Sequence, residues 1–564
     1  MLKNIFKENK GITLIALVVT IIVVLILAGI SISMLTGQNG ILNRTVEAKE
    51  KTEVADENEK VKLAIISAKI ENNQITEDTL KKALDNQFGS GETTVENNQD
   101  GSYTVKMNNL GKREYTIEDD GSLMEGSYSK WDGTSATEPT EKTNNEIHIY
   151  TVSELKWLAN QVNDEGNTFE GYTIYLENNL DLGARKENDN WETDANENVK
   201  WTAIGKTADN MLKGTFEGNN HIIKDMYVND GTDFNGIFGN SNSIRNLTVK
   251  DSYVKGKTAT AGIVGALRDG TIENCRNINT RVESVEAANA GGIVGVANNN
   301  TRVLNCNNSG KIINEKTYTY STYGEYSQIG GIVGGAYNNC TVENCYNIGE
   351  VTGNGHMVGG IAGLLADYGN MQKCYNTGNI KGKGNSTGGL VGQNYASTTI
   401  ENCYNTGNIT GENYTGGIAG TAASVVTKCY NTGNVLGTSG ITGGIVGGFV
   451  TKIPQDISLC YNSGKVEAPK QVGGISGYLG AQGYAGKEYK CYNKGEIICT
   501  TTSDEKGEIV GKMTNDATVS QCYFYTNDTS KYGVGAINNG GNLETQRTEK
   551  NINSFEEFIN WIEQ

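Results

Sequence analysis

Proline and histidine are scarce in this chain, and both shortages limit what it can be. Its 564 residues include 3 prolines and 3 histidines. No cysteine pair has the CxxC spacing and no HExxH occurs, so the ligand patterns of zinc fingers and zinc proteases are missing. We therefore expect no metal site and no cofactor. With so little proline, tight turns must depend on the 72 glycines and on asparagine.

Positive charge is also in short supply. Lys and Arg total 48 against 65 Asp and Glu, which gives a formal net charge of −17. No basic stripe offsets this excess, so a nucleic-acid backbone is excluded as a partner. Solubility and self-repulsion are the ordinary consequences of such a charge.

What the sequence does have is a two-part motif that recurs through its second half. A segment G-G-I-V-G, or a close variant, is followed about fourteen residues later by a cysteine, usually within C-Y-N-T-G. Most of these cysteines lie 26 to 31 residues apart. Two signals that repeat in step indicate one structural unit stacked many times. The cysteines of the motif are Cys275, Cys306, Cys345, Cys374, Cys403, Cys429, Cys460, Cys491 and Cys522.

A single repeat predicts three short strands and no helix. In residues 388–415 the apolar segments are 388–392, 399–405 and 408–411, separated by turn residues. Three strands per coil predict an all-β fold, a parallel β-helix of the right-handed kind that parallel crossovers favour. Ile244–Leu247 and Ile223–Met226 extend the cysteine segment upstream, which gives about eleven coils over residues 201–530.

The cysteine and the asparagine two residues later should both point inward. Free cysteine acts as a small hydrophobe, and parallel in-register side chains have poor geometry for disulfides, so we expect buried thiols. The asparagines should bond from rung to rung through their amides. Besides Asn277 and Asn308, they are Asn347, Asn376, Asn405, Asn431, Asn462 and Asn493.

The tyrosine between cysteine and asparagine should point outward, and it is the candidate binding residue. Stacked aromatic rings on a surface bind sugar rings or apolar protein patches, although cross-rung stacking also stabilises a sheet by itself. The series is Tyr346, Tyr375, Tyr404, Tyr430, Tyr461, Tyr492 and Tyr523. The aliphatic residue three before each cysteine, such as Ile400, cannot share the cysteine's face on a regular strand. A bend is therefore expected between the two.

The repeated unit G-G-[IL]-[VA]-G…C-Y-N-[TS]-G resembles the GLUG repeat of bacterial surface proteins, which include adhesins and the non-catalytic parts of IgA-peptidase-like proteins. The resemblance covers about residues 201–530. It implies a β-helix at the cell surface with an adhesive or binding role, and it does not imply proteolysis. A likeness at the level of fold does not choose a ligand.

The amino terminus predicts a membrane segment. Residues 1–11 carry Lys3, Lys7 and Lys10, and residues 12–34 contain no charge. This length spans a bilayer as a helix, and the lysines favour a single pass in the cell membrane with the N-terminus inside and the bulk of the chain outside.

The stretch from Lys10 to Ile15 resembles the leader of type IV prepilins. That resemblance implies cleavage after Gly11 by a prepilin peptidase, methylation of Ile12 and passage through a pilus or type II secretion-like machinery. Ala16 departs from the family, whose members usually carry glutamate there. A plain signal anchor is the alternative.

Four further regions complete the expected organisation. Residues 35–125 predict a pilin-like helix, a second helix opened by Thr76 and a small strand region. Residues 126–145 have the composition of a linker. Residues 146–200 predict an N-terminal cap of strand, helix and strand. Residues 531–564 form a tail whose helix, opened by a capping box at Ser554, should cover the last coil or, alternatively, serve as a docking helix.

Three functions compete on this pattern. The first is a non-catalytic surface stalk that binds a glycan or protein ligand on a host or other cell through the tyrosines. The second is a minor pilin or pseudopilin whose role is assembly. The third is a β-helix polysaccharide-active enzyme, which requires a cluster of acids or bases that breaks the repeat. Glu273, Glu343 and Glu401 repeat with the motif instead, so we expect no enzyme activity.

Overall fold

The structure is a computed structural model. The chain folds into two compact units, residues 1–127 and 128–564. Each unit is described by itself. The structure describes residues 59–69, 75–97, 103–107, 114–117, 123–125, 128–184, 199–229, 231–285, 289–314, 327–395, 397–448, 456–480, 486–501, 505–514, 516–526, 530–537, 542–548 and 550–563.

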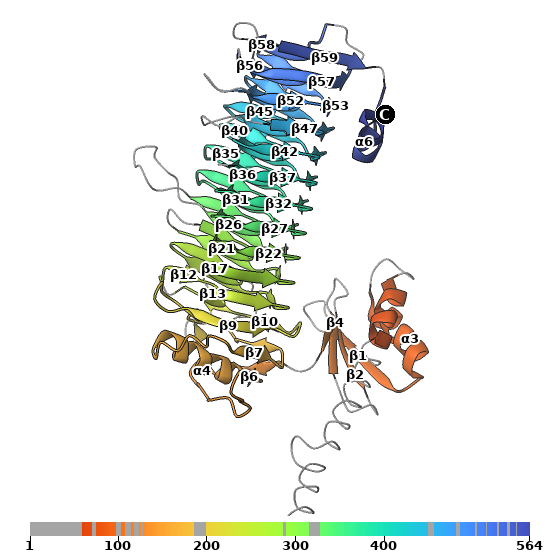
Figure 1. Cartoon of the computed structure of the whole chain (residues 1–564). Coiled ribbons are helices and arrows are strands. Elements are labelled where there is room, and N and C mark those ends of the chain that lie inside the picture. Colours follow the sequence, from red (N-terminus) through yellow and green to blue (C-terminus); the bar gives the residue numbers. More distant parts are fainter. Residues whose placement is uncertain are drawn as a thin grey trace, which may run out of the picture. The chain divides into compact units, whose positions relative to one another are not determined.

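The first unit is a small α+β domain (Figure 1). Residues 59–69 are helical, and α3 (Glu77–Phe88) follows. Thr76 caps α3 by accepting a hydrogen bond from the backbone N–H of Thr79, as its sequence position predicted. The strands β1 (Thr93–Asn97), β2 (Tyr103–Met107), β3 (Glu114–Ile117) and β4 (Leu123–Glu125) form an antiparallel sheet in that order. Val61, Ile65 and Leu80 lie in its core.

The predicted leader, residues 1–11, and the predicted membrane segment, residues 12–34, lie outside the described residues, and with them Gly11, Ile12 and Ala16. In the part of the chain that the structure describes, no helix has the length and apolar character needed to cross a membrane.

One turn of the second unit contains five short strands, not the three that the sequence predicted. In the turn that begins at Ser386 they are β35 (Ser386–Gly388), β36 (Val391–Asn394), β37 (Thr399–Glu401), β38 (Tyr404–Asn405) and β39 (Ile409–Gly411). The segment 399–405 is split because Asn402 has a positive φ of 54°, which turns the chain between β37 and β38. The bend expected before the cysteine is therefore confirmed, and it converts one predicted strand into two.

The turns stack as a parallel solenoid of about eleven turns (Figure 1). β35 and β39 each belong to a ten-stranded sheet, whereas β36, β37 and β38 belong to a third sheet of 35 strands. The register is residue on equivalent residue: β35 pairs with β40 (Tyr414–Gly416), and β38 pairs with β43 (Tyr430–Asn431) so that Tyr404 lies beside Tyr430. Each motif position therefore becomes a column along the solenoid.

The sequence alignment of the two turns upstream of Cys275 is correct for Ile244 and wrong for Ile223. Ile244 pairs with Ile272, as aligned from the sequence. On its other side Ile244 pairs with Phe216, while Ile223 pairs with Val249. The aromatic Phe216 occupies the aliphatic column there, so an alignment that followed aliphatic residues alone shifted the register.

The N-terminal cap has the predicted strand, helix and strand. β6 (Glu146–Ile149) pairs in parallel with β7 (Thr173–Leu176), and between them α4 (Val152–Asn163) buries Leu155, Leu158 and Val162. The segment predicted as a linker, 126–145, also takes part. Its β5 (Ser129–Lys130) pairs with β8 (Leu180–Asp181), and the Trp131 side chain is buried with its ring centroid 5.9 Å from that of Trp201.

The second glycine of each G-G pair leaves space for the asparagine column. At Gly389 an added Cβ would overlap the carbonyl oxygen of Gly417 in the next turn and lie 2.6 Å from Cγ of Asn405. Only a residue without a side chain allows this approach of two backbones and an amide. The G-G-I-V-G and C-Y-N-T-G segments of the motif therefore recur together because the glycine of the first packs against the asparagine of the second.

The C-terminal helix is not an end cover. α6 (Phe555–Ile562) packs on the flank of the solenoid, where its Phe558 is buried in one apolar cluster with Tyr461 and Tyr492 (Figure 1). A helix with apolar residues on one face needs an apolar surface, and the tyrosine column supplies one. The prediction that this helix covers the last coil is therefore wrong.

Candidate functional site

The cysteine and asparagine columns fill the interior. All nine motif cysteines are buried, and they are free thiols, as are Cys340 and Cys499. From Asn277 to Asn493, each asparagine of the column donates a side-chain N–H to the side-chain oxygen of the next, at 2.7 to 2.9 Å. Asn405 also donates to the carbonyl oxygen of Gly407, at 2.8 Å. Both columns are buried, so neither forms part of the exposed surface.

The tyrosine column begins as an open aromatic stack. Tyr346, Tyr375, Tyr404 and Tyr430 are partly exposed, and successive ring centroids lie 4.9, 4.9 and 4.8 Å apart with interplanar angles of 6° or less. The spacing equals the distance between paired strands, so the backbone register holds the rings in place. Partial burial raises the pKa of the Tyr375 and Tyr404 hydroxyls, which therefore stay neutral. Ile348, two residues after Tyr346, is an exposed apolar residue, at 51%.

Two of the seven predicted binding tyrosines are not accessible. Tyr461 and Tyr492 are buried because α6 lies over them, and the ring centroid of Phe558 is 6.1 Å from each of theirs. Their hydroxyls donate to the carbonyl oxygens of Ile552 and Lys550, at 3.3 and 2.9 Å. The prediction of an outward column is therefore wrong at these two positions. The strands do direct the rings outward, but a later segment of the chain covers them.

The two parts of the column meet at Tyr430. Its ring stacks on that of Phe555, with centroids 4.9 Å apart. A groove of about 360 Å³ lies at this junction, lined by Tyr430, Tyr461 and Phe555 together with polar residues. Tyr523, on the far side of α6, contacts Trp561 edge to face at 4.8 Å. The accessible part of the column is thus Tyr346, Tyr375 and Tyr404, with Tyr430 at its boundary.

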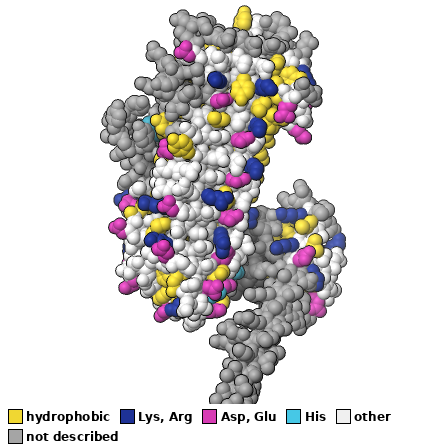
Figure 2. Space-filling model, in the orientation of Figure 1, with side chains coloured by type: hydrophobic (Ala, Val, Ile, Leu, Met, Phe, Trp, Pro, Cys, Tyr) yellow, Lys and Arg dark blue, Asp and Glu magenta, His cyan; other side chains and the backbone are white. Residues whose placement is uncertain are grey.

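Charges near the open stack are paired between turns. Lys373 binds Glu343 and Lys428 binds Glu401, each with 3.1 Å between nitrogen and oxygen. Glu343 and Glu401 are two of the three repeating acids considered for catalysis, with Glu273, and each of the two has a lysine of the next turn as its partner. On the face shown in Figure 2, charged side chains of both signs lie interspersed with uncharged polar surface.

One turn interrupts the aliphatic columns of the interior. Glu488, in β52 (Lys487–Tyr489), pairs with Ile457 of the preceding turn and Val519 of the next. In the same turn Ser476, in β51 (Ser476–Leu479), lies between Val446 and Val510. Both side chains are completely buried.

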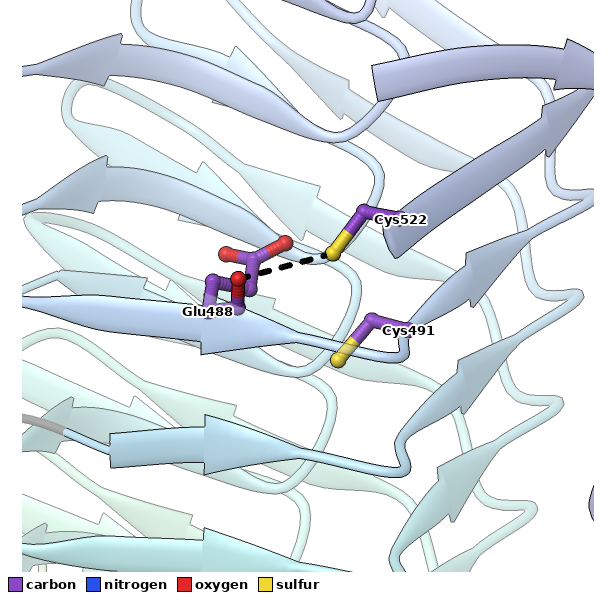
Figure 3. Close-up of side chains that lie close together, drawn as sticks. All are labelled: Glu488, Cys491 and Cys522. Atoms are coloured by element: carbon purple, nitrogen blue, oxygen red, sulfur yellow. Dashed lines mark hydrogen bonds between the residues drawn. The ribbon is translucent and has the colours of Figure 1, made fainter. Parts of the chain in front are cut away.

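Ser476 and Glu488 are hydrogen-bonded to each other. Glu488 lies beside two cysteines of the column, Cys491 and Cys522 (Figure 3). The Ser476 hydroxyl donates to Oε2 of Glu488 at 2.7 Å, while Oε1 of Glu488 is buried without a hydrogen-bond partner. A carboxylate oxygen of Glu488 and the Sγ atoms of Cys491 and Cys522 all lie within 4.8 Å of one another. Burial raises the pKa of Glu488 to about 8 and raises that of the Cys491 thiol.

Sequence reasoning missed Glu488, although a signal was present. The residue three before each cysteine is aliphatic at Ile400, Val426 and Ile457, and Glu488 breaks this series at Cys491. The expectation of no metal site rested on short cysteine and histidine spacings. A solenoid instead brings together ligands that lie a full turn apart, such as Cys491 and Cys522.

Comparison with known proteins bears on the repeats. Residues 325–352 and 383–410 match the family model described as the GLUG motif. No curated protein matches the chain. A solved structure from Bacteroides ovatus, described as a "putative immunoglobulin A1 protease", is 14% identical, with 76% of this chain and 90% of that chain covered and a TM-score of 0.28. That similarity carries no argument about function. The second unit is thus a parallel β-helix that contains GLUG repeats.

Proposed function

We propose that this chain is a surface-displayed, non-catalytic binding protein whose ligand packs against Tyr346, Tyr375 and Tyr404. The observation that carries the proposal is the contact between Phe555 and Tyr430, in which the tyrosine column already receives an aromatic ring from another segment of the chain. In Tyr375 and Tyr404 both ring faces are stacked on neighbouring tyrosines, whereas Tyr346, at the other end of the stack, is stacked on one described ring, that of Tyr375. Tyr346 therefore offers the ring face that Phe555 takes up on Tyr430, and Tyr375 and Tyr404 offer their ring edges.

The open stack is well suited to a flat apolar partner. Its rings are held parallel by the strand register, so little side-chain freedom is lost when a ligand binds. The favourable ligands are the apolar face of a sugar ring or an aromatic side chain, since both match the ring face of Tyr346 at the end of the stack and can pack on the ring edges of Tyr375 and Tyr404. Repetition at about 4.9 Å lets an extended ligand contact several rings.

The charges around the stack favour binding over catalysis. Glycoside cleavage requires two carboxyl groups placed on either side of the bond, one of them kept protonated. Glu343 and Glu401 are instead neutralised by Lys373 and Lys428. Ion pairing with Lys373 also lowers the pKa of Glu343, the opposite of what a general acid needs.

We further propose that residues 12–34 anchor the chain in the cell membrane, with the β-helix outside and Gly11–Ile12 as a prepilin-type processing site. The support is the charge-free segment after three lysines and its resemblance to prepilin leaders. Anchoring of this kind would display the tyrosine stack toward other cells or surfaces.

A glycan array and a panel of aromatic peptides, probed with the full-length chain, test the binding proposal. We expect a ligand that binds wild type and loses at least tenfold in affinity to Tyr375→Ala/Tyr404→Ala. Tyr368→Ala/Tyr395→Ala is the matched control, because these exposed tyrosines lie outside the column. Equal binding by both double variants, or no binding by wild type, would contradict the proposal.

A further inference from the structure

We propose that Glu488, Cys491 and Cys522 form a buried binding site for a thiophilic divalent cation such as Zn²⁺. The three residues come from one face of the solenoid interior, and their potential ligand atoms lie within 4.8 Å of one another (Figure 3). This site is separate from the tyrosine surface and does not depend on the proposed function.

The polar cluster is built from two coordinated changes in one turn. A carboxyl group replaces the aliphatic side chain between Ile457 and Val519, and a hydroxyl replaces the one between Val446 and Val510. Burying a carboxyl group in an apolar core costs free energy unless its oxygens are hydrogen-bonded. The Ser476 hydroxyl provides a hydrogen bond to only one of the two oxygens of Glu488. Oε1 of Glu488 remains buried without a partner, on the side chain that reaches toward the two thiols.

A bound cation would supply the missing partner. Two thiolates and one carboxylate make a donor set that Zn²⁺ accepts, with sulfur and oxygen ligands drawn in to about 2.3 and 2.1 Å. The Ser476 hydroxyl would act from outside the metal's ligand shell by orienting the carboxylate, as partners of metal ligands commonly do.

The rest of the cysteine column shows why the site is confined to this turn. At Cys403 and Cys429 the neighbouring positions of the aliphatic column hold Ile400 and Val426, which offer no ligand atom. Among the described residues, the group at Glu488 alone combines three such ligand atoms at this distance. Cys403 and Cys429, which are adjacent thiols without a carboxyl group, therefore serve as the control for the contribution of Glu488.

Cobalt spectroscopy of the full-length chain tests the inference. The protein is refolded under reducing conditions with Co²⁺, because the ligands are buried and the ion must enter as the strands pair. All variants carry Cys499→Ser, which removes the one partly exposed thiol among the described cysteines. We expect a thiolate-to-cobalt charge-transfer band and the intense visible bands of low-coordinate Co²⁺, at one ion per chain, and we expect Zn²⁺ to abolish both.

Two variants distinguish this site from the thiol column in general. Glu488→Ile/Ser476→Val restores both aliphatic columns, should fold, and should lose the cobalt bands. Cys403→Ala keeps the site and should retain them. The proposal is overturned if wild type, folded by circular dichroism, shows no thiolate–cobalt band. It is equally overturned if Glu488→Ile/Ser476→Val binds cobalt as wild type does, since the thiols alone would then be sufficient.

Discussion

The ring of Phe555 stacks on the ring of Tyr430, with centroids 4.9 Å apart and an interplanar angle of 25°. Tyr430 is stacked in the same way on Tyr404, at 4.8 Å. Phe555 of the C-terminal helix thus stacks on Tyr430 as the tyrosines of successive turns stack on one another. This contact divides the column into a covered part and an open part, and it gives the open part its proposed role.

Phe558→Ala should detach α6 without unfolding the solenoid. The substitution removes a fully buried ring that packs on Tyr461 and Tyr492. Its loss should lower the free energy that holds α6 on the solenoid by about 3–5 kcal/mol. Because α6 contacts only the flank, we expect faster hydrogen exchange confined to residues 555–562 and to the strands that carry the two tyrosines. The exposed Glu556→Ala is the control and should exchange as wild type. Cooperative unfolding of the whole solenoid in Phe558→Ala would show that α6 has a larger structural role.

Gly389→Ala should be far more destabilising than Gly353→Ala. At Gly389 a Cβ would overlap the backbone of Gly417, whereas at Gly353 it would meet only the side chains of Val358 and Ile329, at 2.8 and 3.2 Å. Side chains can shift, but a paired backbone cannot. We expect a loss of about 3 kcal/mol or more for Gly389→Ala and a smaller loss for Gly353→Ala in chemical denaturation. Similar midpoints for the two variants would count against the packing of the glycine on the asparagine column.

Asn405→Ala should break the amide column at its centre. Asn405 accepts from Asn376 and donates to Asn431, each at 2.8 Å, so its loss leaves a buried amide group on either side without one partner. The expected cost is about 3 kcal/mol, seen as a lower thermal midpoint. The neighbouring Thr406 is exposed, and Thr406→Ala should change stability by no more than about 0.5 kcal/mol. A similarly small effect of Asn405→Ala would mean that the column contributes little to stability.

Mass spectrometry of the mature N-terminus tests whether the chain is processed between Gly11 and Ile12. Processing as a prepilin should yield a chain that begins with N-methylated Ile12 in membranes of cells that contain a prepilin peptidase. Gly11→Ala, a mild change at the cleavage position, should reduce that product and leave the leader attached. An intact Met1 in the wild-type chain would exclude the pilin route and leave the signal anchor.

Repetition made much of the solenoid predictable. When equivalent residues recur once per turn, parallel stacking places them side by side whatever the details of the bends, so the cysteine and asparagine columns follow from spacing alone. The bends themselves were harder to predict. A bend before the cysteine was expected, but residue type does not locate it: the left-handed residue that splits the segment is Asn402 in one turn and Lys428 or Leu459 in later turns. Phe216 shifted the upstream register because an aromatic residue replaced the expected aliphatic one.

The sequence by itself determined the repeating unit, the parallel stacking and which side chains form columns, because these depend on contacts between equivalent positions of neighbouring turns. Only the tertiary structure decided which tyrosines are accessible and where the interior has a polar site. The contact of Phe558 with Tyr461 joins segments that no repeat relates. The approach of Glu488 to Cys522 brings together side chains of two neighbouring turns, one of which breaks the aliphatic column. Periodicity cannot predict either contact, because each is a departure from the repeat.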